Sequence, residues 1–243
     1  DWRAGANGGS ALEAASEAAY ARIFRLLDTQ GLPHLWRAWN YMAHIHGDDA
    51  GLERYRRFNK GRGQAFENAA RSVVGLVPAA CAIGLAQGPL SVAFLAGTVP
   101  ALPIENPRQV SAYRYPADYG PRSPTFSRAA LVYPPGQEWL FISGTASIVG
   151  HQSVHEGDVT TQAHESLNNI EAVLAEANRA SRQGGYTLGG LTYRVYVRHA
   201  ADYKAVHQVM QQRCLDAPAV YLLADICRSE LLVEIEAMAG HSA

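Results

Sequence analysis

An order of predicted elements that occurs twice along the chain constrains the fold most strongly. In each half, a helix is followed by a strand, a second helix and two further strands. The first set is predicted at residues 11–29, 34–42, 51–70, about 80–86 and 90–97. The second set is predicted at residues 160–182, 191–199, 201–214, 218–224 and 230–239. Residue identity between the halves is weak, so the repeat is one of pattern only.

This repeat predicts an α+β protein of two units, each a sheet covered on one face by two helices. We place the units at residues 1–104 and 105–243. The second unit has an additional predicted hairpin over 127–133 and 138–148, which the first unit lacks. Because the chain also begins at Asp1 without a methionine, we expect that its front has been cut short.

The first predicted helix has the clearest signals. Residues 11–29 are rich in alanine, and their apolar positions recur every three or four residues. Ser10 stands directly before them, and serine is a favoured N-cap because its side-chain oxygen accepts a hydrogen bond from a free backbone N–H. We therefore expect a helix that begins after Ser10.

Composition excludes several classes of protein. A formal net charge of −1 gives no support for nucleic-acid or membrane-surface binding. No apolar run approaches the roughly 20 residues that a membrane span needs. The three cysteines (Cys81, Cys214 and Cys227) are too few for a disulfide framework or a zinc site, which indicates a reducing cytoplasm.

Residues 105–129, hereafter the connector, join the two predicted units. They contain four arginines, three tyrosines and four prolines, which predicts a stiff, irregular segment. Arginine offers a bidentate fork to a carboxylate, and tyrosine adds a hydroxyl and a flat wall. The connector is therefore either a receptor for a small planar carboxylate or a surface segment with solvated arginines. The candidate ligands within it are Tyr115, Tyr119, Arg122 and Arg128.

The last predicted strand carries two glutamates among apolar residues. Glu234 and Glu236 are two positions apart, which places both side chains on one face of the strand. A carboxylate surrounded by apolar groups is desolvated, which raises its pKa and makes it a usable general acid near neutral pH. The alternative is that this face is open to solvent and both glutamates are ordinary surface charges.

Two further segments have residues suited to a site. Cys227 lies seven residues before Glu234, and the neighbouring Arg228 could lower its thiol pKa. A predicted strand ends in small residues that include Gly144 and Ala146, where a ligand could approach the backbone closely. The histidines at 151 and 155 lie in a predicted loop without helical spacing, so we expect no metal site.

Three segments, taken in order, resemble the chorismatase family: NPRQVSAYRYPADYGPRSPTFSRA, ISGTASIVGH and CRSELLVEIEA. Chorismatases cleave chorismate into pyruvate and a cyclic or aromatic acid. The resemblance covers most of the chain, although family members usually carry additional N-terminal sequence. It implies two units of the RidA/YjgF type, each a mixed sheet packed on one face by two helices.

The resemblance also implies roles for individual residues. Glu234 would be the general acid that protonates the enolpyruvyl group of chorismate. Tyr115, Arg128 and Arg194 would hold its carboxylates, and Ala146 with its neighbours would line the ring pocket. No cofactor is implied.

A cysteine seven residues before the catalytic glutamate resembles the subgroup that forms 3-hydroxybenzoate, and some members also release 4-hydroxybenzoate. The alternatives are the hydrolytic sister activity, which gives a dihydroxycyclohexadiene carboxylate, and a RidA-like imine deaminase or binding module. We expect a monomer or a homotrimer.

Overall fold

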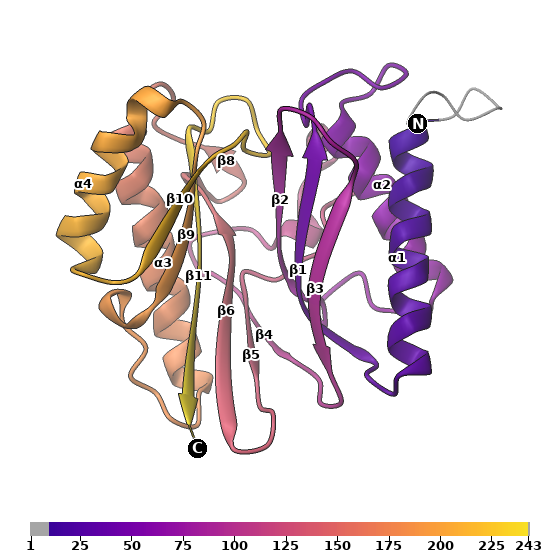
Figure 1. Cartoon of the computed structure of the whole chain (residues 1–243), viewed down its shortest axis with the longest axis horizontal. Coiled ribbons are helices and arrows are strands. Elements are labelled where there is room, and N and C mark those ends of the chain that lie inside the picture. The colour runs from indigo at the N-terminus through magenta and orange to yellow at the C-terminus, as the bar shows by residue number, and fades with distance from the viewer. Residues whose placement is uncertain (1–9, 243) are drawn as a thin grey trace.

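The computed structural model describes residues 10–242 and has four layers. Two sheets face each other in the middle, and a pair of helices covers the outer face of each sheet (Figure 1). In this view α1 and α2 lie at the right, and α3 and α4 lie at the left. A functional site can therefore form between the inner faces of the two sheets.

The N-terminal unit has a three-stranded sheet in the order β2-β1-β3. Strand β1 pairs parallel with β2 and antiparallel with β3. The elements are α1 (Ala11–Thr29), β1 (His34–Ala43), α2 (Arg54–Asn68), β2 (Ala79–Leu85) and β3 (Ser91–Gly97). The predicted cap of α1 is confirmed, because the Ser10 side chain accepts a hydrogen bond from the Glu13 backbone N–H.

The C-terminal unit has a six-stranded sheet in the order β10-β9-β11-β6-β5-β4. Its strands are β4 (Leu102–Ile104), β5 (Ala129–Val132), β6 (Gln137–Thr145), β9 (Thr192–Val197), β10 (Ala219–Leu223) and β11 (Val233–Ser242). Its helices are α3 (Val159–Ala180) and α4 (Tyr203–Cys214). A separate small hairpin joins β7 (Ile148–Val149) to β8 (Gln152–Ser153). Short 3-10 turns occur at Ala112–Arg114, Ala117–Tyr119, Leu188–Gly190 and Ala200–Asp202.

The predicted repeat is confirmed in the pairing of the strands. In the second unit β9 pairs parallel with β10 and antiparallel with β11, as β1 does with β2 and β3. The expected α+β units with two helices each are therefore present. The boundary after residue 104 stays a prediction, and β4 already pairs with β5 in the second sheet.

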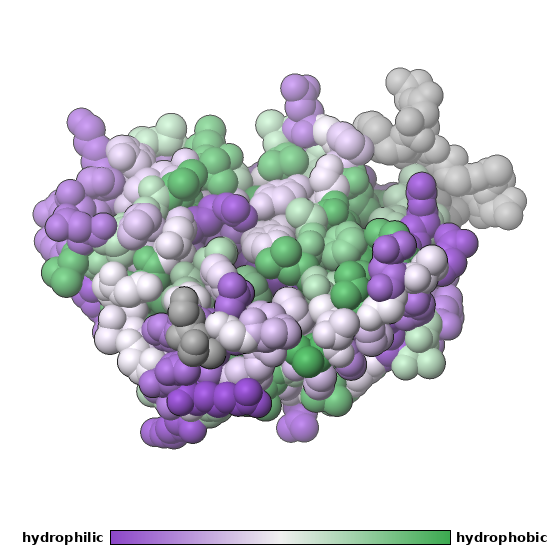
Figure 2. Space-filling view, turned by 60° about the horizontal axis from the view of Figure 1, so that its bottom comes forward, coloured by the Kyte–Doolittle hydropathy of each residue, from purple (hydrophilic) through white to green (hydrophobic). Residues whose placement is uncertain are grey.

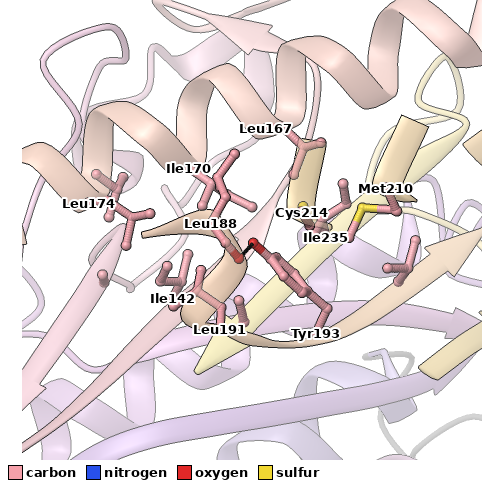
Figure 3. Close-up of a cluster of buried hydrophobic side chains, with 14 of the residues drawn as sticks. Ile142, Leu167, Ile170, Leu174, Leu188, Leu191, Tyr193, Met210, Cys214 and Ile235 are labelled. Atoms are coloured by element: carbon pink, nitrogen blue, oxygen red, sulfur yellow. Dashed lines mark hydrogen bonds between the residues drawn. The ribbon is translucent and has the colours of Figure 1, made fainter. Parts of the chain in front are cut away.

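The main hydrophobic core lies between α3, α4 and the outer face of the second sheet. Figure 3 shows its buried side chains, which include Ile142, Leu167, Ile170, Leu174, Leu188, Leu191, Tyr193, Met210, Cys214 and Ile235. The Tyr193 hydroxyl donates a 2.7 Å hydrogen bond to the Leu188 carbonyl, so this buried hydroxyl is paired. Each fully buried aliphatic side chain of this kind stabilises the fold by about 1.5–3 kcal/mol.

Alternation along β11 determines what faces the gap between the sheets. Val233, Ile235 and Ala237 belong to the core beneath the helices. Because successive side chains in a strand point to opposite faces, Glu234 and Glu236 point toward the N-terminal sheet. They are nevertheless only 3% and 4% exposed. The alternative in which both are surface charges is therefore wrong.

The edge strand β2 joins the first unit to the second. Gly84 and Asp225 exchange two backbone hydrogen bonds of 2.8 and 3.0 Å. The Ser143 hydroxyl on β6 accepts a 2.9 Å hydrogen bond from the Ala80 backbone N–H. These bonds hold the inner faces of the two sheets in a defined register.

Exposed apolar residues on the surface bear on whether the chain pairs with other chains. Figure 2 shows one face, with strongly hydrophilic side chains gathered toward its margins. Several exposed large apolar side chains lie on edge strands: Leu95 on β3, Leu102 on β4, and Val220, Leu222 and Leu223 on β10. Such edges can pair with another chain. A monomeric or trimeric state stays a prediction.

Among residues 10–242, none of the helices is both long enough and apolar enough to span a bilayer.

Candidate active site

A cavity of about 200 Å³ lies where the two units and the connector meet, and we call it the central cavity. The first unit contributes the start of α2, and the second contributes the end of β6 and the segment before β11. The residues that line it are Glu53, Tyr55, Arg56, Tyr115, Tyr119, Pro124, Phe126, Arg128, Gly144, Ala146, Ile148, Cys227, Arg228, Ser229, Glu230 and Glu234. Seven of the nine residues predicted to form the site therefore lie together.

Glu234 is the buried one of the three glutamates that line the cavity. Burial raises the pKa of its carboxyl to about 8, and the charge of Glu236 adds to this effect while Arg37 opposes it. At neutral pH the side chain therefore keeps its proton. A carboxylic acid that is still protonated at pH 7 is suited to proton donation.

Gly144 makes room for that carboxyl group. A Cβ atom built at this position would lie 1.9 Å from Oε1 of Glu234 and 3.0 Å from Cβ of Cys81. The register of β6 against β11 also shifts between Ile235 and Ala237, beside this glycine. The small residues at the end of β6 were predicted to admit a ligand, and here they also admit the side chain of the acid itself.

Two arginines and two tyrosines form the cationic side of the cavity. Nη2 of Arg128 donates 2.8 Å hydrogen bonds to the Tyr115 hydroxyl and the Val110 carbonyl. The guanidinium carbon of Arg228 lies 4.2 Å from the ring centroid of Tyr119 and 5.3 Å from that of Tyr115. The two tyrosine rings are 5.2 Å apart between centroids. The connector and Arg228, from the segment before β11, therefore form a wall that brings positive charge and hydroxyl groups together.

Both arginines have an N–H group without a hydrogen-bond partner among the described residues. Nε of Arg128 and Nη2 of Arg228 are buried and find no hydrogen-bond partner among the described residues. Unpaired buried donors are costly, which is the condition expected of groups that await an anionic ligand. The interpretation of the connector as a set of solvated surface arginines does not fit Arg128, which is 4% exposed.

Cys227 differs from the expectation for a reactive thiol. Burial raises its pKa to about 12, and the charge of Glu234 adds to the effect, while Arg228 opposes it only in part. Arg228 does lower the thiol pKa as suggested, but desolvation outweighs it, so the net pKa is raised. The side chain is a neutral wall of the cavity beside the acid.

Arg122 and Arg194 lie outside the central cavity. Nη2 of Arg122 pairs with Glu67 on α2 at 2.5 Å. Arg194 stands directly opposite Glu236 in the β9–β11 pairing, and its Nη1 bonds to that carboxylate at 2.7 Å. The carboxylate that Arg194 binds therefore belongs to the protein itself. The structure does not bring either arginine to the position expected for a substrate ligand.

Three residues that line the cavity were not predicted as site residues. The sequence analysis did not single out Tyr55 or Arg56, and it named Arg228 only as a neighbour of Cys227. Tyr55 and Arg56 belong to the predicted helix 51–70, where the basic face gave no sign of which arginine turns inward. The histidines of the loop separate: His151 contacts Tyr119, and His155 lies 3.7 Å from Glu165. Within the described part of the chain, no three His, Cys, Asp or Glu side chains come together as a metal site requires.

Comparison with known proteins identifies the family to which this chain belongs. The family model described as chorismatase FkbO/Hyg5-like, N-terminal, matches residues 4–96, and the endoribonuclease L-PSP model matches residues 125–241. A 3-hydroxybenzoate synthase from Streptomyces hygroscopicus is 42% identical over 91% of this chain and 68% of its own length. A chorismatase from Streptomyces rapamycinicus is 42% identical over 94% of this chain and 70% of its own length. The chain belongs to the chorismatase family.

A solved chorismatase supports the same conclusion at the level of the fold. Its crystal structure superposes with a TM-score of 0.89 and 40% sequence identity, and covers 98% of this chain and 72% of the other. The resemblance noted in the sequence is thereby confirmed. The two family models fall one on each side of residues 97–124, so most of the connector lies outside both.

Proposed function

We propose that this chorismatase cleaves chorismate to pyruvate and 3-hydroxybenzoate. One observation carries the proposal: a protonated Glu234 shares one cavity with two arginines that have unpaired donors. Chorismate is a dicarboxylate with an acid-labile enolpyruvyl ether, so it needs both a proton donor and cationic partners. The family relationship and the name of the relative from Streptomyces hygroscopicus support this substrate and product.

The first step is proton transfer from Glu234 to the methylene carbon of the enolpyruvyl group. This makes an oxocarbenium centre, which weakens the ether bond to the ring. Arg128 and Arg228 bind the substrate carboxylates through their free N–H groups, with the Tyr115 and Tyr119 rings along the side. The substrate's own C4 hydroxyl then displaces the pyruvate oxygen, and the resulting arene oxide opens to the phenol.

Exclusion of water separates this route from hydrolysis. The sum of 3-hydroxybenzoate and pyruvate has the same atoms as chorismate, so no water is consumed. Phe126, Ile148 and the neutral Cys227 give the cavity an apolar side near the acid. A site that keeps water away favours attack by the internal hydroxyl.

The test is product identification from purified protein and chorismate by liquid chromatography and mass spectrometry. We expect 3-hydroxybenzoate and pyruvate in equal amounts, with 4-hydroxybenzoate as an allowed minor product. Glu234→Gln should still bind chorismate in calorimetry but release no pyruvate. A dihydroxycyclohexadiene carboxylate would reassign the chain to the hydrolytic activity. Failure of chorismate to bind would favour a RidA-like deaminase or binding module.

A further inference from the structure

We propose that Glu236 is a positioning residue whose ionised carboxylate, held by two arginines beside the acid, keeps Glu234 protonated for the reaction. This inference rests on the proposed function, because it assigns Glu236 a role in preparing the proposed acid. It is carried by the different environments of two carboxyl groups that are two residues apart on one strand.

Glu236 is surrounded by donors. Its Oε2 accepts a hydrogen bond from Arg37 on β1. Its Oε1 accepts hydrogen bonds of 2.7 Å from Arg194, 3.0 Å from Trp39 and 3.1 Å from Tyr196. Two guanidinium groups, an indole N–H and a hydroxyl stabilise the charged form of a carboxylate. Both carboxylate oxygens of Glu236 therefore have cationic or N–H partners although the side chain is buried.

Glu234 has an equally buried position and none of these partners. Among the described residues, no side chain donates a hydrogen bond to its carboxyl group, and its nearest charged neighbour along the strand is the anionic Glu236. When two interacting carboxyl groups have such different surroundings, one stays ionised and the other stays protonated. The arrangement assigns the proton to Glu234.

The electrostatic balance around Glu234 involves more than one element. Burial raises its pKa first, the charge of Glu236 raises it further, and Arg37 lowers it. The other titratable or charged groups that line the central cavity and a smaller adjoining one are Glu53, Tyr55, Arg56, Arg62, Cys81, Tyr115, Tyr119, Arg128, Cys227, Arg228 and Glu230. Glu236 and Arg37 are the two charges that shift the pKa of Glu234, and they act in opposite directions.

The experiment is a titration of the glutamate carboxyl carbons by 13C NMR in the full chain, with the Glu234 signal identified by its loss in Glu234→Gln. In Glu236→Gln the like charge is gone and Arg37 remains, so we expect the midpoint of Glu234 to fall by about one pH unit or more. In Arg37→Met the stabilising cation is gone, so we expect the midpoint to rise. A merely structural role for Glu236 would not produce shifts of opposite sign.

A double variant guards against loss of folding. Glu236→Gln leaves Arg37 buried without its partner, whereas Arg37→Met with Glu236→Gln removes the pair together, which proteins often tolerate. We expect its Glu234 midpoint to lie between those of the two single variants. A midpoint that is unchanged or higher in Glu236→Gln overturns the inference. If that variant does not fold, a midpoint that fails to rise in Arg37→Met overturns it.

Activity gives an independent measurement. Because the acid must be protonated, kcat/KM should fall as pH rises through the pKa of Glu234, and Glu236→Gln should move this fall to lower pH. With a shift of one unit, kcat/KM at pH 8 should lie about elevenfold below the variant's own low-pH plateau, compared with about twofold for the wild type. If the NMR midpoints shift as expected but no chorismate is cleaved, the proposed function fails and the electrostatic coupling stands. If chorismate is cleaved and the midpoints do not respond, the coupling fails alone.

Discussion

Arg128 is the side chain that a substrate carboxylate should depend on most, because it is buried in the central cavity with an unpaired Nε. Arg128→Ala should raise KM steeply, since a buried carboxylate left without its partner costs about 2–4 kcal/mol, and kcat should fall less. Arg122→Ala is the matched control. Its guanidinium pairs with Glu67 outside the cavity, so its KM should stay near that of the wild type. Equal effects in the two variants would contradict the assignment.

A substitution at Cys227 tests whether the apolar side of the cavity controls which product forms. Cys227→Ala enlarges the space beside Glu234, which should admit water and move the product mixture toward the dihydroxycyclohexadiene carboxylate. Chromatography of the products over a time course measures the ratio. Cys214→Ala, in the core at the end of α4, should leave the ratio unchanged. An unchanged ratio in Cys227→Ala would show that Cys227 does not control which product forms.

At the scale of residues, the sequence predicted which side chains have suitable chemistry better than it predicted their partners. Period 2 correctly placed Glu234 and Glu236 on one face. It could not distinguish them, because Arg37, which pairs with Glu236, lies 199 positions earlier in the chain. The resemblance implied that Arg194 binds substrate, and the sequence alone could not show that Glu236 is its neighbour across the sheet, because that contact exists only when β9 pairs with β11.

At the scale of elements, the cap of α1 offers a test that is independent of catalysis. The Ser10 hydroxyl accepts a 3.0 Å bond from the Glu13 N–H and donates to Asp49 at 2.5 Å. Ser10→Ala should therefore lower the free energy of unfolding by about 1 kcal/mol, as measured by urea denaturation, and leave kcat unchanged. Ser91→Ala, at an exposed position on β3, should change it by less than about 0.5 kcal/mol. No difference between the two would contradict the capping role.

The helices and the longer strands were predicted within a few residues because each carries its own periodicity. Helix α3 was expected at 160–182 and spans Val159–Ala180. The shortest elements, such as β4, β7 and β8, have two or three residues and no period to detect. They form because neighbouring strands supply their hydrogen bonds, which is a property of the assembled sheet.

At the scale of the whole molecule, burying Glu234 should weaken the fold as pH rises. The unfolded glutamate releases its proton near pH 4.5, whereas the folded one keeps it until about pH 8. Between these values unfolding releases a proton, so stability falls with increasing pH by up to about 1.4 kcal/mol per unit. Glu234→Gln removes this dependence.

Urea denaturation at several pH values measures the effect. The stability of Glu234→Gln relative to the wild type should increase steadily from pH 5 to pH 8. Parallel curves over that range would mean that Glu234 titrates normally in the folded protein, which would contradict its assignment as an acid held protonated by burial.

The site as a whole exists only when both units are in place, because its acid lies on β11, its cationic wall comes from the connector and Arg228, and the start of α2 lines the same cavity. The repeated order of elements predicted two sheets with helices but did not say that their inner faces meet. The resemblance to chorismatases implied two such units but not that their sheets face each other, and most connector residues lie outside both matched family models. The function therefore depends on contacts that no single segment of the sequence contains.

The source of the proton transferred to the substrate tests the central claim most directly. Chorismate is cleaved in D₂O, and the pyruvate is trapped at once by reduction to lactate and examined by NMR. If Glu234 protonates the methylene carbon, its exchangeable proton is replaced by deuterium and the methyl group should carry one deuterium per molecule. A methyl group without deuterium would mean that the hydrogen comes from the substrate's own ring, and would contradict general-acid catalysis by Glu234.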